Sequence, residues 1–239
     1  MLKGQTLLSL MLSLALSSLL LLVISQFYAN TQVQNQQILL RLKLQAELQR
    51  TIQLIGKDLR RAGFRALNNK LIESNVSLFE LNEQGGAMLI SQANNAPQNS
   101  CALFFYDLDA NGCIGQKYTK NSCLNGNQNT AKEIEKELFG YKLNGKMIET
   151  KQTYKSAVKV ACKSVECQQA LQQPACNAGG GWTDLLDENE YEITHLQFIP
   201  LAEGEGTGEK GIEIQLAGNL KAYPEIQYET SIVIPLWNQ

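Results

Sequence analysis

The hydrophobic pattern divides the N-terminal quarter of the chain into two consecutive helical segments. Residues Leu7 to Ile24 contain no charged residue, no proline and no glycine. At a rise of about 1.5 Å per residue, such a segment approaches the ~17–25 residues that span a bilayer core. Lys3, on the near side of the apolar run, predicts a cytoplasmic N-terminus and an exported remainder.

Beyond the apolar run, the pattern changes to one hydrophobic stripe on an otherwise polar helix. The stripe recurs at steps of three and four residues, which predicts a helix with a single buried face: Leu44, Leu48, Ile52, Ile55, Leu59 and Ala62. Gly63 suits a left-handed helix cap, and Arg60 and Arg61 suit the negative end of the helix dipole. A continuous helix over both segments would extend on the order of 85 Å, which is typical of an assembly element.

The rest of the chain is predicted to form short antiparallel strands. Alternating or continuous apolar runs predict strands at 76–81, 87–90, 101–106, 138–143, 146–150, 191–198, 212–216 and 226–234. Two hairpins are expected, one around Gln84-Gly85-Gly86 and one around Asn144-Gly145, which favours a type I′ turn. The alternation slips near His195, which indicates a bulge. The predicted class is therefore α+β.

An acidic turn follows the apolar run that ends at Tyr106. Asp107, Asp109, Asn111 and Gly112 occupy positions 1, 3, 5 and 6 of a calcium-loop pattern, but position 12 is Tyr118 instead of glutamate. These residues are weak metal candidates. An Asx-rich turn that bonds its own backbone explains the pattern better, so no metal and no cofactor are expected.

Composition changes this picture in two ways. The net charge of −2 argues against a generally nucleic-acid-binding surface, and the basic cluster at residues 57–65 is interpreted as a solvated helix end more readily than as a phosphate or DNA contact. The six cysteines all follow the apolar segment, which predicts up to three disulfides in an oxidising compartment with the pairing left open: Cys101, Cys113, Cys123, Cys162, Cys167 and Cys176. A zinc site is the weaker alternative, since the chain has one histidine.

No catalytic set is apparent. Glu133 and Glu137 are paired carboxylates, but the interspersed lysines favour a solvated short helix over an acid–base pair. A catalytic thiol would need a base, and His195 has no orienting partner that the sequence identifies. The chain is therefore not expected to be an enzyme.

The N-terminus resembles the cleavage site of type IV prepilins and pseudopilins. Gly4 precedes Gln5-Thr6-Leu7-Leu8-Ser9, and in that family a peptidase cuts after the glycine and methylates the new N-terminus. The resemblance implies cleavage between Gly4 and Gln5 and N-methylation of Gln5. Two positions depart from the family: Gln5 replaces the usual Phe or Met, and Ser9 replaces the glutamate that is thought to neutralise a neighbour's terminal amine.

Further motifs, in the same order along the chain, resemble PilW-type minor pilins and the prepilin-peptidase-dependent B proteins. They are Asp58-Leu59-Arg60-Arg61-Ala62-Gly63-Phe64, the Tyr106–Gly112 turn, Phe139-Gly140-Tyr141 and Gly181-Trp182. The resemblance implies a type IV pilin-like fold in which the second half of a long N-terminal helix packs on an antiparallel, disulfide-stapled head. The implied segments are a leader (1–4), a transmembrane and filament-core helix (5–29), an amphipathic spine helix (30–63) and the head (64–239).

The implied role is to prime or cap a type IV pilus-like filament, in pilus biogenesis, competence or motility. The alternatives are a pseudopilin at the tip of a type II secretion system and a tip-located module that binds DNA or a receptor. The implied partners are other minor pilins or pseudopilins, the major pilin, the prepilin peptidase and the inner membrane; the charge does not support nucleic acid. The implied location is the inner membrane, with the head in the periplasm, and then the pilus or pseudopilus.

Overall fold

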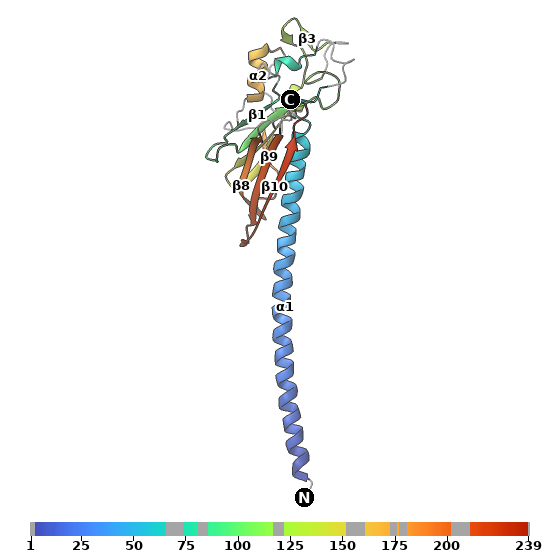
Figure 1. Ribbon diagram of the computed structural model, residues 1–239, viewed down its shortest axis with the longest axis vertical. Coiled ribbons are helices and arrows are strands. Elements are labelled where there is room, and N and C mark those ends of the chain that lie inside the picture. The colour runs from blue at the N-terminus through green and yellow to red at the C-terminus, as the bar shows by residue number, and fades with distance from the viewer. Residues whose placement is uncertain are drawn as a thin grey trace. The chain divides into compact units, whose positions relative to one another are not determined.

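A computed structural model describes residues 3–65, 74–80, 86–116, 122–151, 161–172, 176, 181–201 and 211–238. The chain consists of two compact units, residues 1–43 and residues 44–239. The described residues of the first unit belong to helix α1 (Lys3–Leu59), in line with the long helix that the sequence predicts. The second contains the end of α1 and the remaining elements (Figure 1). The expected segment boundaries after residues 4, 29 and 63 remain predictions.

The second unit contains three antiparallel sheets among its described residues. The five-stranded sheet has the order β1-β2-β5-β6-β7, the three-stranded sheet has the order β10-β9-β8, and β3 pairs with β4. The strands of the five-stranded sheet are β1 (Met88–Ser91), β2 (Cys101–Phe105), β5 (Leu138–Asn144), β6 (Met147–Lys151) and β7 (Trp182–Asp184). The others are β3 (Leu124–Asn125), β4 (Gln128–Asn129), β8 (Tyr191–Leu201), β9 (Gly211–Leu220) and β10 (Tyr223–Pro235). The short helices are η2 (Val76–Leu78), η3 (Ile134–Glu137) and α2 (Ser164–Gln172).

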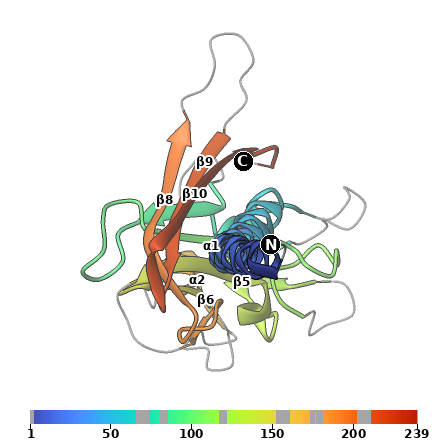
Figure 2. The same ribbon diagram turned by 90° about the horizontal axis from the view of Figure 1, so that it is seen from below.

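The predicted stripe is the face by which α1 packs in the second unit. All six stripe residues, from Leu44 to Ala62, are 0–2% exposed. Gly56 lies against β10, where a side chain on this glycine would come within 2.8 Å of Ile234. Gln49 donates a hydrogen bond to the Tyr228 hydroxyl at 2.9 Å. The end of α1 therefore lies beside the three-stranded sheet, as Figures 1 and 2 show.

The end of α1 is fixed by a left-handed glycine. Gly63 has φ +76°, which confirms the predicted left-handed cap. Its N–H donates to the Phe105 carbonyl at 2.8 Å, and a side chain at this position would come within 2.4 Å of the Asn238 carbonyl oxygen. Only glycine fits both the backbone conformation and the space.

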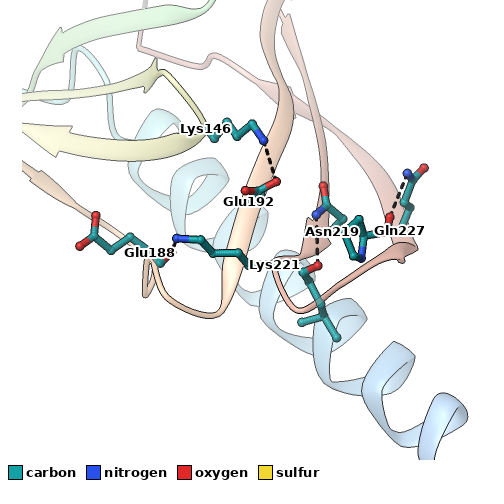
Figure 3. A network of polar contacts seen from close by, with 8 residues as sticks. Lys146, Glu188, Glu192, Asn219, Lys221 and Gln227 are labelled. Atoms are coloured by element: carbon teal, nitrogen blue, oxygen red, sulfur yellow. Dashed lines mark hydrogen bonds and ion pairs between the residues drawn. The ribbon is translucent and has the colours of Figure 1, made fainter.

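A polar contact joins the two larger sheets at the β5–β6 turn. The Ile193 N–H on β8 donates to the Lys146 carbonyl at 2.7 Å, and Lys146 Nζ lies 2.9 Å from Glu192 Oε2 (Figure 3). Separately, Lys221 Nζ, in the β9–β10 turn, donates to the Glu188 carbonyl just before β8 at 3.1 Å (Figure 3). The two contacts of Lys146 set the β5–β6 hairpin against β8.

The six cysteines form three disulfides: Cys101–Cys176, Cys113–Cys123 and Cys162–Cys167. The first joins two cysteines that are 75 residues apart in sequence and holds Cys176 against strand β2. The α+β class, the long helix and the disulfide-stapled head that the resemblance implies are confirmed.

Two local predictions are wrong. Val76–Leu78 forms a short 3-10 helix instead of a strand, and the expected turn at Gln84–Gly85 lies outside the described residues. The β5–β6 turn is shifted by one residue, because Asn144 pairs with Met147 and leaves Gly145 and Lys146 as the central residues. Gly145 has φ +57° and Lys146 is not among the positive-φ residues, so the turn is not the predicted type I′. The bulge near His195 is confirmed, since the β8–β9 register shifts between Ile193 and His195.

Candidate functional site

The first candidate is the apolar part of α1. Its large side chains between Leu7 and Ile24 are all at least 55% exposed, on every side of the helix. α1 is long and apolar enough to cross a membrane, which is compatible with a single-pass membrane anchor. Such an exposed apolar surface requires lipid or other apolar helices around it.

Three serine hydroxyls of this segment are satisfied within the helix. Ser13, Ser17 and Ser18 donate to the carbonyls of Leu10, Ser13 and Ala15 at 2.9, 2.6 and 2.9 Å, respectively. Back-bonding of this kind lets a hydroxyl lie in an apolar environment without an unpaired donor. Gly4 and Gln5 lie in the first turns of α1, and cleavage between them, with methylation of Gln5, stays a prediction.

The side chains of the predicted basic cluster at the end of α1 differ in their surroundings. Lys57, Arg60 and Arg61 are exposed, whereas Arg65 forms an ion pair with Glu80. The Arg61 guanidinium lies 5.9 Å from the centre of the Tyr106 ring, so the head supplies a partner that the local sequence does not reveal. Two of the cluster's charges are thus engaged within the head.

A hydrogen bond also joins Asp58, near the end of α1, to the five-stranded sheet. The Tyr141 hydroxyl on β5 donates to Asp58 Oδ2 at 2.6 Å. Burial and the neighbouring Asp58 carboxylate both raise the pKa of Tyr141, so it remains a donor. The contact fixes the end of the helix by a charge-assisted bond.

The second candidate is the acidic turn that follows β2, and its carboxylates bond its own backbone. Asp107 Oδ1 and Oδ2 accept the N–H groups of Asn111 and Gly112 at 3.1 and 2.7 Å. Asp109 Oδ1 also accepts the Asn111 N–H at 3.0 Å, and the Asn111 side chain accepts from Cys113 at 2.8 Å. This is the geometry of an Asx-rich turn.

Glu137, which is distant in sequence, completes this turn. It was expected on a solvated helix, but its residue is only 4% exposed, so that prediction is wrong. Its Oε1 accepts the Leu108 N–H at 2.7 Å, with the Asp109 N–H at 3.4 Å, and its Oε2 accepts the Gly115 N–H at 2.5 Å. Sequence reasoning missed this residue because its partners lie more than 20 positions away.

Carboxylate oxygens from Asp107, Asp109 and Glu137 lie within 4.8 Å of one another. Burial, followed by the charges of the two aspartates, raises the pKa of Glu137 to about 7, although the backbone N–H donors oppose the shift. Burial also raises the pKa of Asp107. The three oxygen-bearing groups are of the kind that hard cations prefer, but Asp107 and Glu137 already accept backbone hydrogen bonds, for which a cation would have to compete.

The buried side-chain amide of Asn75 holds the chain just after the acidic turn, at Ile114. Asn75 Nδ2 donates to the Ile114 carbonyl at 2.8 Å and to Asn129 Oδ1 at 2.7 Å, while its Oδ1 accepts the Ile114 N–H at 2.7 Å. The Cys113–Cys123 disulfide lies next to these contacts in the chain. Asn75 had no signal in the local sequence pattern, because only the folded loop gives it partners.

The thiol and histidine candidates do not form a nucleophilic site. All six cysteines are in disulfides, so the chain has no free thiol. His195 lies at the bulge of β8, half-buried. Since a catalytic cysteine would need an ionisable thiol, the disulfide interpretation accounts for these residues.

Comparison with known proteins places these features in a family. A family model described as prepilin peptidase-dependent protein B matches residues 37–236. A protein of Haemophilus influenzae that is described as uncharacterized is 65% identical over 239 residues, covering 100% of this chain and 98% of the relative. No solved structure matches.

Proposed function

We propose, from the premise that this chain belongs to the prepilin peptidase-dependent protein B family, that it is a minor pilin or pseudopilin that primes or caps a type IV pilus-like filament. Membership makes the chain a pilin-like protein. The step from there to initiation or capping is the proposal. The role is structural, with no reaction catalysed by the chain itself.

The exposed apolar half of α1 carries this proposal. Within residues 7–24, every large apolar side chain is exposed, whereas the stripe at 44–62 is buried. An apolar helix of this kind is stable in the inner membrane, and it keeps apolar surroundings when it moves from lipid into a bundle of similar helices. The predicted orientation has the N-terminus in the cytoplasm and the head in the periplasm.

Ser9 supports a place at the end of the filament. The position lacks the carboxylate that the resemblance leads one to expect, and a buried terminal ammonium needs a charged partner. A subunit without that carboxylate is poorly suited to accept a neighbour's N-terminus along the shaft. It is better suited to the tip, where only one side of its helix meets other subunits. The proposed partners are accordingly other minor pilins and the major pilin.

The first experiment follows processing and assembly together. With an active prepilin peptidase, the mature protein is expected to begin at N-methylated Gln5, and Gly4→Leu is expected to keep the intact N-terminus. Deletion of the gene is expected to reduce the number of filaments, and Thr6→Ser serves as a matched control that retains processing. Intact Met1 in peptidase-competent cells, or unchanged filament number after deletion, would contradict the proposal.

A second experiment tests the tip position. The Ser9→Glu variant restores the missing carboxylate and is expected to raise the number of copies of this subunit per filament, measured by quantitative mass spectrometry of purified filaments. Ser13→Ala is the matched control, because it changes a neighbouring hydroxyl without adding a charge. If the unmodified subunit is instead found at even density along the whole filament, it belongs to the shaft, and this result would contradict capping.

A further inference from the structure

The sequence contains three Asn-Gly pairs, at residues 111–112, 125–126 and 144–145. In such a pair the backbone nitrogen of the glycine can attack the side-chain carbonyl of the asparagine, because glycine has no Cβ that obstructs the approach. Leu124-Asn125-Gly126 and Leu143-Asn144-Gly145 are identical as tripeptides. A large difference in reactivity between these two pairs must therefore come from the fold.

The two identical tripeptides lie in the same kind of hairpin turn. Each asparagine pairs across a two-residue turn whose first central residue is the glycine. Gly126 has φ +60° and Gly145 has φ +57°. Asn125 and Asn144 are both exposed. Turn geometry and access to water therefore do not distinguish the two asparagines.

The side chains of the two asparagines differ in their hydrogen bonds. Asn144 Nδ2 donates to Glu149 Oε1 at 2.7 Å, and Glu149 Oε2 lies 3.1 Å from Nζ of the buried Lys142. Because Lys142 fixes the carboxylate, the amide of Asn144 must leave a charge-assisted bond before its carbonyl carbon can turn toward the glycine nitrogen. Among the described residues, the side chain of Asn125 makes no hydrogen bond.

The two hairpins also differ in what surrounds them. β5 and β6 are inner strands of the five-stranded sheet, whereas β3 and β4 form a separate sheet of two residue pairs. The Thr130 N–H donates to the Cys123 carbonyl at 2.9 Å and fixes the base of the β3–β4 hairpin, so that local opening is confined to its tip. A hairpin of two pairs opens at low cost. The backbone at Asn125 therefore reaches other conformations more often than the backbone at Asn144.

The third pair is protected by its own turn. The Gly112 N–H, whose nitrogen would have to attack, donates to Asp107 Oδ2 at 2.7 Å. The side chain of Asn111 is held at both ends, because Oδ1 accepts the Cys113 N–H at 2.8 Å and Nδ2 donates to the Gly115 carbonyl at 3.1 Å. A reaction at Asn111 therefore requires the loss of three hydrogen bonds.

We propose that Asn125 is a site of spontaneous deamidation, while the fold protects the Asn-Gly pairs at 111–112 and 144–145. The Gly126 nitrogen forms a bond to Asn125 Cγ and gives up its proton to water. The bond between Cγ and the side-chain nitrogen breaks, and ammonia leaves. Water then opens the resulting succinimide ring at either carbonyl carbon, which yields aspartate or isoaspartate. Water is the only reactant besides the chain.

The reaction changes the surface of the head. Each conversion adds one carboxylate, so the formal net charge of the chain changes from −2 to −3. Isoaspartate also lengthens the backbone by one carbon at the tip of the β3–β4 hairpin. The Cys113–Cys123 disulfide holds the chain just before β3, so the head stays folded around the modified turn. The head of an older molecule thereby differs in charge from that of a new one.

Peptide mapping by mass spectrometry tests the proposal on the full chain, incubated folded in detergent micelles with its disulfides intact. Incubation in ¹⁸O-labelled water and digestion in ordinary water mark the conversions that precede digestion. From the hydrogen bonds that each side chain must lose, Asn125 is expected to convert about tenfold faster than Asn144 and at least about 100-fold faster than Asn111. Isoaspartate is expected beside aspartate at position 125. Equal or faster conversion of Asn144 or Asn111, or aspartate without isoaspartate, overturns the proposal.

The chain reduced and unfolded in urea is the matched control. Without the fold, the two identical tripeptides are expected to convert at similar rates. A preference for Asn125 that persists in urea would show that the flanking sequence decides the rate, and would equally overturn the proposal. None of these results depends on whether the chain caps a filament.

Two variants test the assigned cause. Asn125→Gln lengthens the side chain by one carbon, so the five-membered ring cannot form and the main conversion is expected to disappear. Glu149→Ala frees the amide of Asn144 and is expected to raise its conversion several-fold without changing that of Asn125. Glu192→Ala is the matched control, because it removes the ion pair of Lys146 in the same turn and leaves the Asn144 bond intact. Unchanged conversion of Asn144 in Glu149→Ala overturns the protective role of this bond, and the unmodified chain decides the proposal if that variant fails to fold.

Discussion

The two halves of helix α1 have opposite relations to the rest of the chain. Between Leu7 and Ile24 apolar residues cover every side of the helix and all the large ones are exposed. Between Leu44 and Ala62 the six stripe residues share one face of the helix, and each is at most 2% exposed. A stripe can be covered by one sheet, whereas an all-round apolar surface needs partners on all sides. The second half is thus completed by its own head, and the first by lipid or other subunits.

The largest expected effect comes from a charge in the second half of α1, which the head covers. Ile55→Asp places a carboxylate at a position with 0% exposure and is expected to cost more than about 4 kcal/mol, which is enough to unfold the head. Leu54→Asp, at the adjacent position with 43% exposure, is the matched control and is expected to cost less than about 1 kcal/mol. Urea unfolding of the chain in micelles measures both. Equal effects at the two positions would contradict the one-sided packing.

A charge in the first half of α1, which the head does not cover, is expected to disfavour membrane insertion and to leave the stability of the head unchanged. Leu16→Arg lies at the middle of the apolar segment and is expected to disfavour insertion by about 3 kcal/mol. Unfolding of the head is expected to stay unchanged, because the first unit contributes nothing to the buried stripe. Membrane fractionation and urea unfolding of the same variant give the two readouts. Loss of head stability in Leu16→Arg would mean that the two halves are not separable.

A third prediction concerns the hydrogen bond that fixes the C-terminal end of α1. Tyr141→Phe removes the donor to Asp58 and leaves that carboxylate without the 2.6 Å bond, so a loss of about 1–2 kcal/mol is expected. Phe139→Leu is a useful comparison, because it changes a ring on the same strand that stacks on Tyr106 without touching Asp58. An equal and small effect of both changes would mean that the hydrogen bond does not fix the helix end.

The buried stripe and the acidic turn show which features the local sequence predicts and which it does not. The stripe was predictable because helix periodicity alone decides which residues share a face, and Gly63 was predictable because only glycine accepts its φ angle without strain. Glu137 was not predictable, because its burial depends on a loop that returns from residues 107–115. The charges of Lys132 and Lys136 beside it wrongly indicated a solvated face.

Contacts that are distant in sequence also explain the smaller differences between the predictions and the structure. The one-residue shift of the β5–β6 turn follows from pairing with neighbouring strands, which sets the register of β5 more firmly than the Asn144-Gly145 preference does. The composition of Val76–Leu78 predicts a strand, but Asn75, directly before it, is held by Ile114 and Asn129, and the three residues form a 3-10 helix. In both cases distant contacts override a local propensity.

The smallest expected effect lies where the two larger sheets meet. The Lys146 side chain, at the β5–β6 turn, is largely exposed, and its ion pair with Glu192 is open to solvent and salt, so Lys146→Ala is expected to change head stability only slightly. The hydrogen bond from Lys146 lowers the pKa of Glu192, so any contribution is present above the ordinary glutamate value near 4.5 and is lost as pH falls through the lowered value. Glu137 has the opposite sign, since its stabilisation is lost as pH rises. A double-mutant cycle with Glu192→Gln at low and high salt measures the pair, and a coupling that high salt leaves unchanged would show that it is shielded from solvent.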